Sequence, residues 1–275
     1  MSEKLKFFDD LWISTQPNPC GMADFWDRRA VSFNAHRKKD DAIEHGRHLT
    51  ELLITKAGLN SGSRLLDIGC GAGHYALVFA RRVAEVTGLD ISAKMIEFAK
   101  GNAEEEKLSH AHFEVLDWTD ADLEAKGWQK KFDFVLASKT PAVNSWATLK
   151  KMMDASRGYC CLISQVDTEH SIRDQLKPLV IWDEEKARIS RTFYCAFNLL
   201  WLQGYFPEVS YLERSWEEDL TLEDAELLYI NYFESLGVLK PEQKKPVIAK
   251  LTALAAGGII HEEVKSKAAM LFWKS

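Results

Sequence analysis

The sequence RLLDIGCGAGHYALVFA, residues 64–80, places three glycines between an apolar run and a segment with helical periodicity. A short apolar run is typical of a buried strand, and the segment after the glycines is typical of a helix that packs on it. Open α/β sheets bind ligands where the carboxyl ends of strands lead into helices. The stretch therefore predicts an α/β fold with a ligand lying against a bare backbone.

The same alternation continues to about residue 166. Apolar runs recur as AEVTGLD, AHFEVLD, FDFVLAS and GYCCLISQV, and helix-period segments such as ISAKMIEFAKGNAEEE separate them. Strands and helices that alternate at this spacing form a doubly wound, mostly parallel sheet with helices on both faces. A later strand, helix, strand unit, which ends in VKSKAAMLFWK, is expected to add an antiparallel edge.

We expect one domain over residues 1–275, because Gly and Pro occur in ones and twos and no linker is evident. Its four expected parts are an N-terminal helical lid (1–60), a cofactor-binding core (61–170), a helical cap inserted after the fifth strand (171–206) and C-terminal strands and helices (207–275).

Composition limits the partners. A net charge of −6 and a pI of 5.8 argue against a broad polyanion-binding surface, so nucleic acid is an unfavoured partner. The basic cluster at 28–39 is followed at once by two aspartates and is interpreted as a solvated helix. No apolar run approaches the length of a membrane span, so we expect a cytoplasmic protein. The five irregularly spaced cysteines predict reduced thiols and no metal site.

Asp90 lies at the end of the second predicted strand, 21 positions after Gly69. A carboxylate at this distance from a glycine loop is suited to a ribose diol. Both nicotinamide dinucleotides and S-adenosylmethionine carry such a ribose, so Asp90 alone does not distinguish them.

The glycine spacing does distinguish them. A dinucleotide site uses G-x-G-x-x-G, whereas the pattern here is G-x-G-x-G and His74 stands at the position of the third dinucleotide glycine. Asp67 also precedes the glycines. A carboxylate there would repel a pyrophosphate, but it could attract the ammonium group of S-adenosylmethionine.

The ordered segments LLDIGCGAG, GLDIS and EVLDW resemble the class I S-adenosylmethionine-dependent methyltransferases over about residues 60–166. The resemblance implies a Rossmann-like sheet of seven strands and S-adenosylmethionine as cofactor. It also implies that the first loop surrounds the methionine end of the cofactor; its residues here are Asp67, Gly69, Gly71 and Gly73.

The resemblance further implies that Asp90 binds the ribose, that Ile91 lies against the adenine and that Asp117 receives the adenine amino group, with Trp118 beside it. Ser138, at the end of the fourth predicted strand, is expected beside the reacting methyl group. Asp117 has a second interpretation as a helix cap, and Trp118 a second interpretation as a core aromatic.

The expected function is methyl transfer to a small-molecule acceptor by in-line displacement. Such a reaction depends on positioning more than on a fixed base, so no catalytic residue is assigned. The lid residues Trp26 and Arg29 are expected near the cofactor. The cap aromatics are expected around the acceptor; they are Trp182, Tyr194 and Trp201.

The alternatives are an RNA or protein methyltransferase, a nicotinamide-dependent oxidoreductase and a cofactor-binding module without turnover. A base-flipping enzyme is disfavoured because the loop after the fourth strand has SKTPAV and lacks an aromatic residue. His170 is a candidate proton acceptor, although a surface position at the start of a helix is the favoured interpretation. The acceptor and the oligomeric state are not specified by the sequence.

Overall fold

The computed structural model describes residues 2–13, 22–181, 191–235 and 237–275. Its strands are β1 (Arg64–Ile68), β2 (Glu85–Asp90), β3 (Ala111–Val115), β4 (Phe132–Ser138), β5 (Ser156–His170), β6 (Glu208–Thr221) and β7 (Ile259–Lys274). Its α-helices are α1 (Glu3–Ile13), α2 (Met22–Arg37), α3 (Asp40–Ala57), α4 (His74–Ala80), α5 (Ala93–Glu105), α6 (Trp146–Ala155), α7 (Arg173–Leu176), α9 (Thr192–Leu202), α10 (Leu222–Ser235) and α11 (Lys244–Leu254). Short 3₁₀ helices are η1 (Trp118–Asp120), η2 (Lys177–Leu179) and η3 (Pro241–Gln243).

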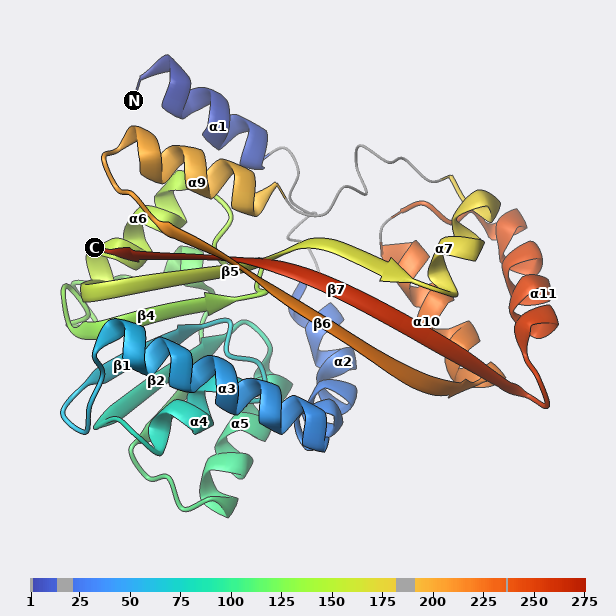
Figure 1. The fold of residues 1–275 in the computed structure, drawn as a ribbon, viewed down its shortest axis with the longest axis horizontal. Helices are drawn as coiled ribbons and strands as arrows, with labels where there is room; N and C mark the ends of the chain where they lie inside the picture. The colour runs from blue at the N-terminus through green and yellow to red at the C-terminus, as the bar shows by residue number, and fades with distance from the viewer. Residues whose placement is uncertain (1, 14–21, 182–190, 236) are drawn as a thin grey trace. The chain divides into compact units, whose positions relative to one another are not determined.

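The strands form one seven-stranded sheet in the order β3-β2-β1-β4-β5-β7-β6. The first five strands are parallel neighbours. β7 runs against β5, because Ser275 N donates to Gly158 O while Ser171 N donates to Glu263 O. The predicted mostly parallel sheet with an antiparallel edge is therefore confirmed (Figure 1).

Contacts within the chain divide it into two compact units. The first unit contains residues 1–164, 192–210 and 270–275, and the second contains residues 165–191 and 211–269. The long strands β5, β6 and β7 each pass from one unit into the other. This division differs from the expected four parts, because the segment 171–206 is split between the units.

The first unit buries its sheet on both faces. On one face, α1, α6 and α9 cover Leu66, Val135 and Leu162 in a single apolar cluster. On the other face, Phe134 of β4 packs with tilted rings against Phe79 of α4 and Phe272 of β7. Figure 1 shows α3, α4 and α5 together on this second side. The glycine loop is thus held between two packed layers.

The second unit has its own apolar core, formed by α7, α10, α11 and the outer part of β7. Thr221 caps α10, since Asp224 N donates to Thr221 Oγ1 at 3.1 Å, as the predicted helix start requires. A buried carboxylate, Glu262, accepts a hydrogen bond from Tyr229 Oη and lies 3.1 Å from His170 Nδ1. The charge of Glu262 is thereby partnered inside the unit.

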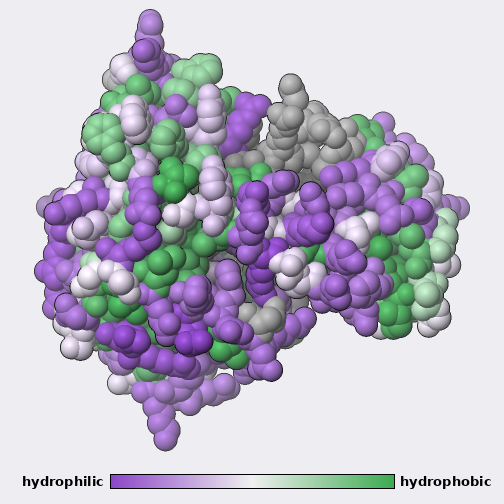
Figure 2. All heavy atoms as spheres, viewed as in Figure 1, coloured by the Kyte–Doolittle hydropathy of each residue, from purple (hydrophilic) through white to green (hydrophobic). Residues whose placement is uncertain are grey.

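Hydrophilic side chains are spread over the face of the molecule drawn in Figure 2, with apolar residues in smaller groups among them. None of the helices in the described part of the chain has the length and apolar character that a bilayer crossing requires. The four cysteines in the described ranges are buried free thiols, as predicted; Cys20 lies outside those ranges.

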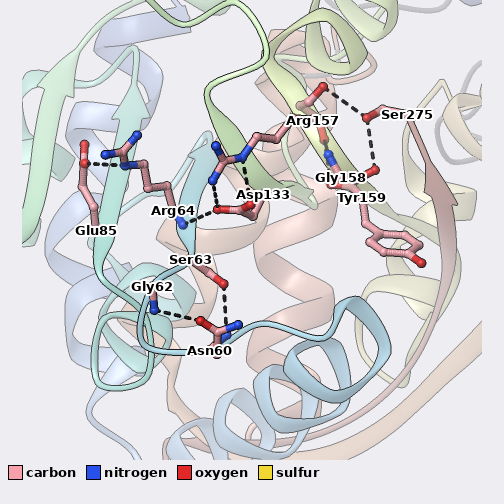
Figure 3. Close-up of polar contacts among 11 residues, drawn as sticks. Asn60, Gly62, Ser63, Arg64, Glu85, Asp133, Arg157, Gly158, Tyr159 and Ser275 are labelled. Atoms are coloured by element: carbon pink, nitrogen blue, oxygen red, sulfur yellow. Dashed lines mark hydrogen bonds and ion pairs between the residues drawn. The ribbon is translucent and has the colours of Figure 1, made fainter.

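The amino-terminal edge of the sheet is fixed by polar contacts (Figure 3). Asp133 accepts hydrogen bonds from Arg64 N at 2.9 Å and from Arg157 Nε and Nη2, each at 2.9 Å. These bonds tie the starts of β1, β4 and β5 together. A Cβ atom at the neighbouring Gly158 would lie only 2.3 Å from Asp133 O.

Replacement of Gly158 by alanine tests this close packing. Because the opposing atom belongs to the backbone, β4 and β5 must separate, and we expect Gly158→Ala to lower the free energy of unfolding by about 1–3 kcal/mol. Gly101→Ala is the control, since a Cβ there meets open space within α5 and should stabilise by about 0.5–1 kcal/mol. Urea unfolding measures both; equal effects of the two changes would contradict the packing assigned to Gly158.

Candidate functional site

The glycine loop connects β1 to α4 at the carboxyl edge of the sheet. Gly69, Gly71 and Gly73 have φ angles of 70°, 54° and 85°, which residues other than glycine rarely adopt. Gly69 N and Cys70 N both donate to Leu89 O, at 2.8 and 2.9 Å. The loop therefore turns back onto the end of β2.

The three glycines differ in what an added Cβ atom would contact. A Cβ at Gly69 would lie 2.1 Å from Thr140 Oγ1, and a Cβ at Gly73 would lie 3.2 Å from the side chain of Leu77. Apart from its chain neighbours, a Cβ at Gly71 would come within 4 Å of one atom of the described residues, Met95 Sδ at 3.9 Å. Gly69 and Gly73 are thus explained by packing within the protein, whereas Gly71 leaves its side of the backbone open.

Asp90 joins the glycine loop to the segment after β2. Its Oδ2 accepts from Gly71 N and its Oδ1 accepts from Ser92 N, each at 2.9 Å. Burial raises the pKa of Asp90, these two N–H groups lower it, and the charge of Asp27 raises it. Each carboxylate oxygen still has a lone pair for a further donor such as a ribose hydroxyl.

Asp67 lies near the end of β1 and is only 2% exposed. Burial, and then the charge of Asp90, raise its pKa to about 7, while a hydrogen bond from Ala76 N lowers it. A buried carboxylate of this kind is stabilised in its charged form by a nearby cation. A cation that approaches this edge of the sheet would therefore favour the ionised form of Asp67.

Ser138 ends β4 beside the glycine loop. Its Oγ is buried and has no hydrogen-bond partner in the part of the chain that the structure describes. A buried hydroxyl without a partner costs about 1–3 kcal/mol, and it marks a place where a water or ligand group completes the bond. Thr140 follows two residues later and packs against Gly69, so both loops meet at this point.

The remaining predicted residues divide into two groups. Ile91 and Asp117 are half-buried at the ends of β2 and β3. Asp117 Oδ1 accepts from Thr119 N and Thr119 Oγ1, each at 2.8 Å, so this oxygen caps η1. Trp118 is fully buried, and its Nε1 donates to Thr148 O at 3.1 Å. Trp118 belongs to the core, because a ring without exposed surface offers no face to an adenine.

The expected cap requires a correction. The described parts of 171–206 are divided between the two units, and the apolar side of α9, with Cys195 and Leu199, packs into the core of the first unit. Tyr194 and Trp201 are each 52% exposed on α9. Trp182 lies outside the described residues. His170 is likewise not the start of a helix, since it is the last residue of β5.

Sequence reasoning missed three residues that support the site. Ser92 is fully buried; its Oγ accepts from Met95 N at 3.0 Å and caps α5. Asp27 on α2 accepts from Ser92 Oγ at 2.5 Å. Thr140 fills the space that Gly69 leaves. Only Ser92 had a local signal, since a serine two residues after a strand-end aspartate is a common helix cap.

The second unit brings together Glu217, His261 and Glu263, whose ligand atoms all lie within 4.8 Å of one another. The three side chains are exposed, and His261 Nδ1 lies 2.9 Å from Asp219 Oδ1. Exposed groups of this kind are common without an ion, so we assign no metal to them.

Three comparisons with known proteins bear on the site. A family model described as a methyltransferase domain matches residues 59–199. A segment of 100 residues is 35% identical to the 23S rRNA (uracil(1939)-C(5))-methyltransferase of Xylella fastidiosa, and one of 81 residues is 42% identical to the ubiquinone biosynthesis O-methyltransferase of Rhodopseudomonas palustris. These matches cover 35% and 29% of this chain, and 23% and 30% of the two relatives.

Among solved structures, phosphoethanolamine N-methyltransferase 2 of Haemonchus contortus superposes with a TM-score of 0.50 at 15% identity. The match covers 83% of this chain and 52% of that one. At this identity it shows a common fold. This chain thus shares its fold with a protein of which it covers about half the length.

The raised pKa of Asp67 gives a test of the site by itself. The folded protein holds a proton on Asp67 up to about pH 7, whereas the unfolded chain releases it near pH 4, so stability falls as the pH rises between these values. Relative to that of Asp67→Asn, the free energy of unfolding of the wild type should fall by about 1 kcal/mol per pH unit from pH 5 to 7. Urea unfolding at several pH values measures the difference, and parallel curves for the two proteins would show that Asp67 is ordinarily ionised.

Proposed function

The chain belongs to the methyltransferase-domain family, whose cofactor is S-adenosylmethionine, and we propose that it transfers the cofactor's methyl group to a small-molecule acceptor. The observation that carries the proposal is the Asp90 carboxylate, which holds the glycine loop and the start of α5 at the end of β2. A nicotinamide-dependent oxidoreductase is set aside on family grounds.

The residues present fit this cofactor. Asp67 is a buried carboxylate that a ligand ammonium would keep ionised, and Asp90 can accept from the ribose diol. The open backbone at Gly71 admits the methionine end, and the Ser138 hydroxyl lacks a partner that a bound group could supply. Ile91 and Asp117 are assigned to the adenine end. Trp118 is left out because it is enclosed in the core.

The bound sulfonium supplies an activated methyl group and a good leaving group. The acceptor's lone pair forms a bond to the methyl carbon as the carbon–sulfur bond breaks, and that electron pair remains on sulfur; a proton on the acceptor is released. The protein's part is to align the acceptor with the breaking bond and to exclude water. The loop from Ser138 to Thr140, packed on the glycine loop, is placed to form one wall of that space.

The surface charges of the first unit support a small acceptor over RNA. The basic cluster that would bind phosphates is partly neutralised, because Arg37 lies 3.4 Å from Glu106 and Lys38 lies 3.5 Å from Glu105. Phosphate binding depends on Lys and Arg that are free to displace counterions. RNA remains the second candidate because the Xylella relative is named for action on 23S rRNA.

The acceptor class is tested by methyl transfer itself. The protein is incubated with S-adenosylmethionine labelled in the methyl group and a cell extract separated by size into small molecules, RNA and protein. We expect label in the small-molecule fraction above the level given by Asp90→Ala. Label that enters RNA and disappears as salt rises would instead support the RNA alternative.

Asp90 itself is tested by calorimetric titration. Loss of a charge-assisted pair to the ribose should weaken S-adenosylmethionine binding by on the order of 2–4 kcal/mol in Asp90→Ala, and by less in Asp90→Asn, which retains an acceptor oxygen. Circular dichroism confirms folding, and NAD serves as a ligand that should not bind. Unchanged affinity in a folded Asp90→Ala protein would exclude Asp90 from the ribose site.

A further inference from the structure

An unbroken line of hydrogen bonds links the N-terminal helix α2 to the proposed ribose carboxylate. Asp27 Oδ1 accepts from Ser92 Oγ at 2.5 Å and from Lys94 N at 3.1 Å. Ser92 N donates to Asp90 Oδ1, and Gly71 N donates to Asp90 Oδ2. Helix α2, the glycine loop and the start of α5 therefore meet at Asp27 and Asp90. Fully buried Ser92 is hydrogen-bonded to both carboxylates.

The other contacts of α2 take a different route. Further along the helix, Asn34 Oδ1 accepts from Asn102 Nδ2 at 2.8 Å, which ties α2 to the far side of α5. Trp26 and Ala30 pack against Ala72 and Met95. Asn102 Nδ2 also donates to Ala72 O at 3.1 Å, so this second set of bonds reaches the glycine loop without Ser92. Asp27 is a residue of α2 whose hydrogen bonds lead to the Asp90 carboxylate through Ser92.

The two carboxylates also interact through charge. The hydrogen bond from Ser92 lowers the pKa of Asp27, while the charge of Asp27 raises the pKa of Asp90. The other groups that face Asp90 are the N–H groups of Ser92, Gly71 and Ile91, which lower its pKa. Asp67 is the remaining nearby carboxylate, and its pKa is raised by Asp90. The Cys70 thiol is kept neutral by burial and by Asp67 and Asp90, and Lys94 acts on Asp27.

We propose that Asp27 is a positioning residue for cofactor binding, which orients Asp90 toward the ribose through Ser92 and so couples the docking of α2 to cofactor capture. The inference rests on the proposed role of Asp90 as the ribose carboxylate. Coupling is reciprocal, so a ligand that engages Asp90 also holds α2 more firmly. The N-terminal helix is then part of the binding site through its hydrogen bonds and not only a cover.

The test uses 5′-methylthioadenosine, which has the adenosine of the cofactor but no amino-acid group, so that Asp67 and an ammonium do not contribute. Asp27→Ala removes both the acceptor and the charge, whereas Asp27→Asn keeps an acceptor oxygen for Ser92. We expect about tenfold weaker binding in Asp27→Ala at pH 8 and recovery of most of that loss in Asp27→Asn. Asn34→Ala is the matched control, because it also removes a contact between α2 and α5 but none of the hydrogen bonds of Asp90 or Ser92, and it should change the affinity less than threefold.

The pH dependence of ligand affinity distinguishes a role of Asp27 in positioning Asp90 from a role only in holding α2 in place. Wild-type affinity should fall as Asp90 becomes protonated in acid. Removal of the Asp27 charge lowers the pKa of Asp90, so in Asp27→Asn the fall should move to lower pH, while in Asn34→Ala it should stay in place. Protection of α2 from proteolysis by the ligand should be lost in Asp27→Ala.

The outcomes distinguish the two proposals. If the wild type binds and both Asp27 variants behave as Asn34→Ala does, with no shift of the pH profile, the role of Asp27 is overturned and the proposed function stands. If the folded wild type binds neither methylthioadenosine nor S-adenosylmethionine, the proposed function fails, and the role of Asp27 fails with it.

Discussion

The carboxylates of buried Asp67 and half-buried Asp90 lie on the adjacent strands β1 and β2, and the charge of Asp90 adds to the cost of ionising Asp67. The protein offsets this cost in part with backbone N–H groups from Ala76, Gly71 and Ser92. Among the described residues, no Lys or Arg contributes to the pKa of Asp67. Under the proposed function, a ligand with an ammonium group and a pair of hydroxyl donors would supply the missing partners at this edge.

The glycine motif is a consequence of the same arrangement. Gly71 N is directed to Asp90, and Gly69 and Cys70 donate to the end of β2, so the loop's N–H groups are used to close it onto the neighbouring strand. A loop that binds a pyrophosphate leaves its N–H groups free for the phosphate oxygens. The G-x-G-x-G spacing therefore matches a loop built around a carboxylate, and the close approach of Thr140 explains why Gly69 has no side chain.

The sheet and the strand-end acids were predictable because they depend on local pattern: apolar runs, glycines and an aspartate at a fixed distance. Contacts between segments that are distant in sequence were not predictable from local pattern. Asp27 and Ser92 are 65 positions apart, and nothing in the sequence around Asp27 marks it as an acceptor. The apolar helix α9 follows the fifth strand and was read as a cap, although its buried side fills the core of the first unit. The fifth strand was expected to end near residue 166, whereas β5 continues to His170 through a segment of alternating polar and charged residues.

The two ends of α2 are held by interactions of different strength. At its carboxyl end, the half-buried side chain of Arg37 lies 3.4 Å from Glu106, whereas the exposed side chain of Lys38 lies 3.5 Å from Glu105, and an exposed pair contributes little and weakens in salt. At its amino end, Asp27 accepts hydrogen bonds from the fully buried Ser92 hydroxyl and from the backbone at the start of α5. Hydrogen bonds to a charged acceptor are stronger and less sensitive to salt. The end of α2 that is held by a charged hydrogen-bond acceptor is therefore the end that lies beside Asp90.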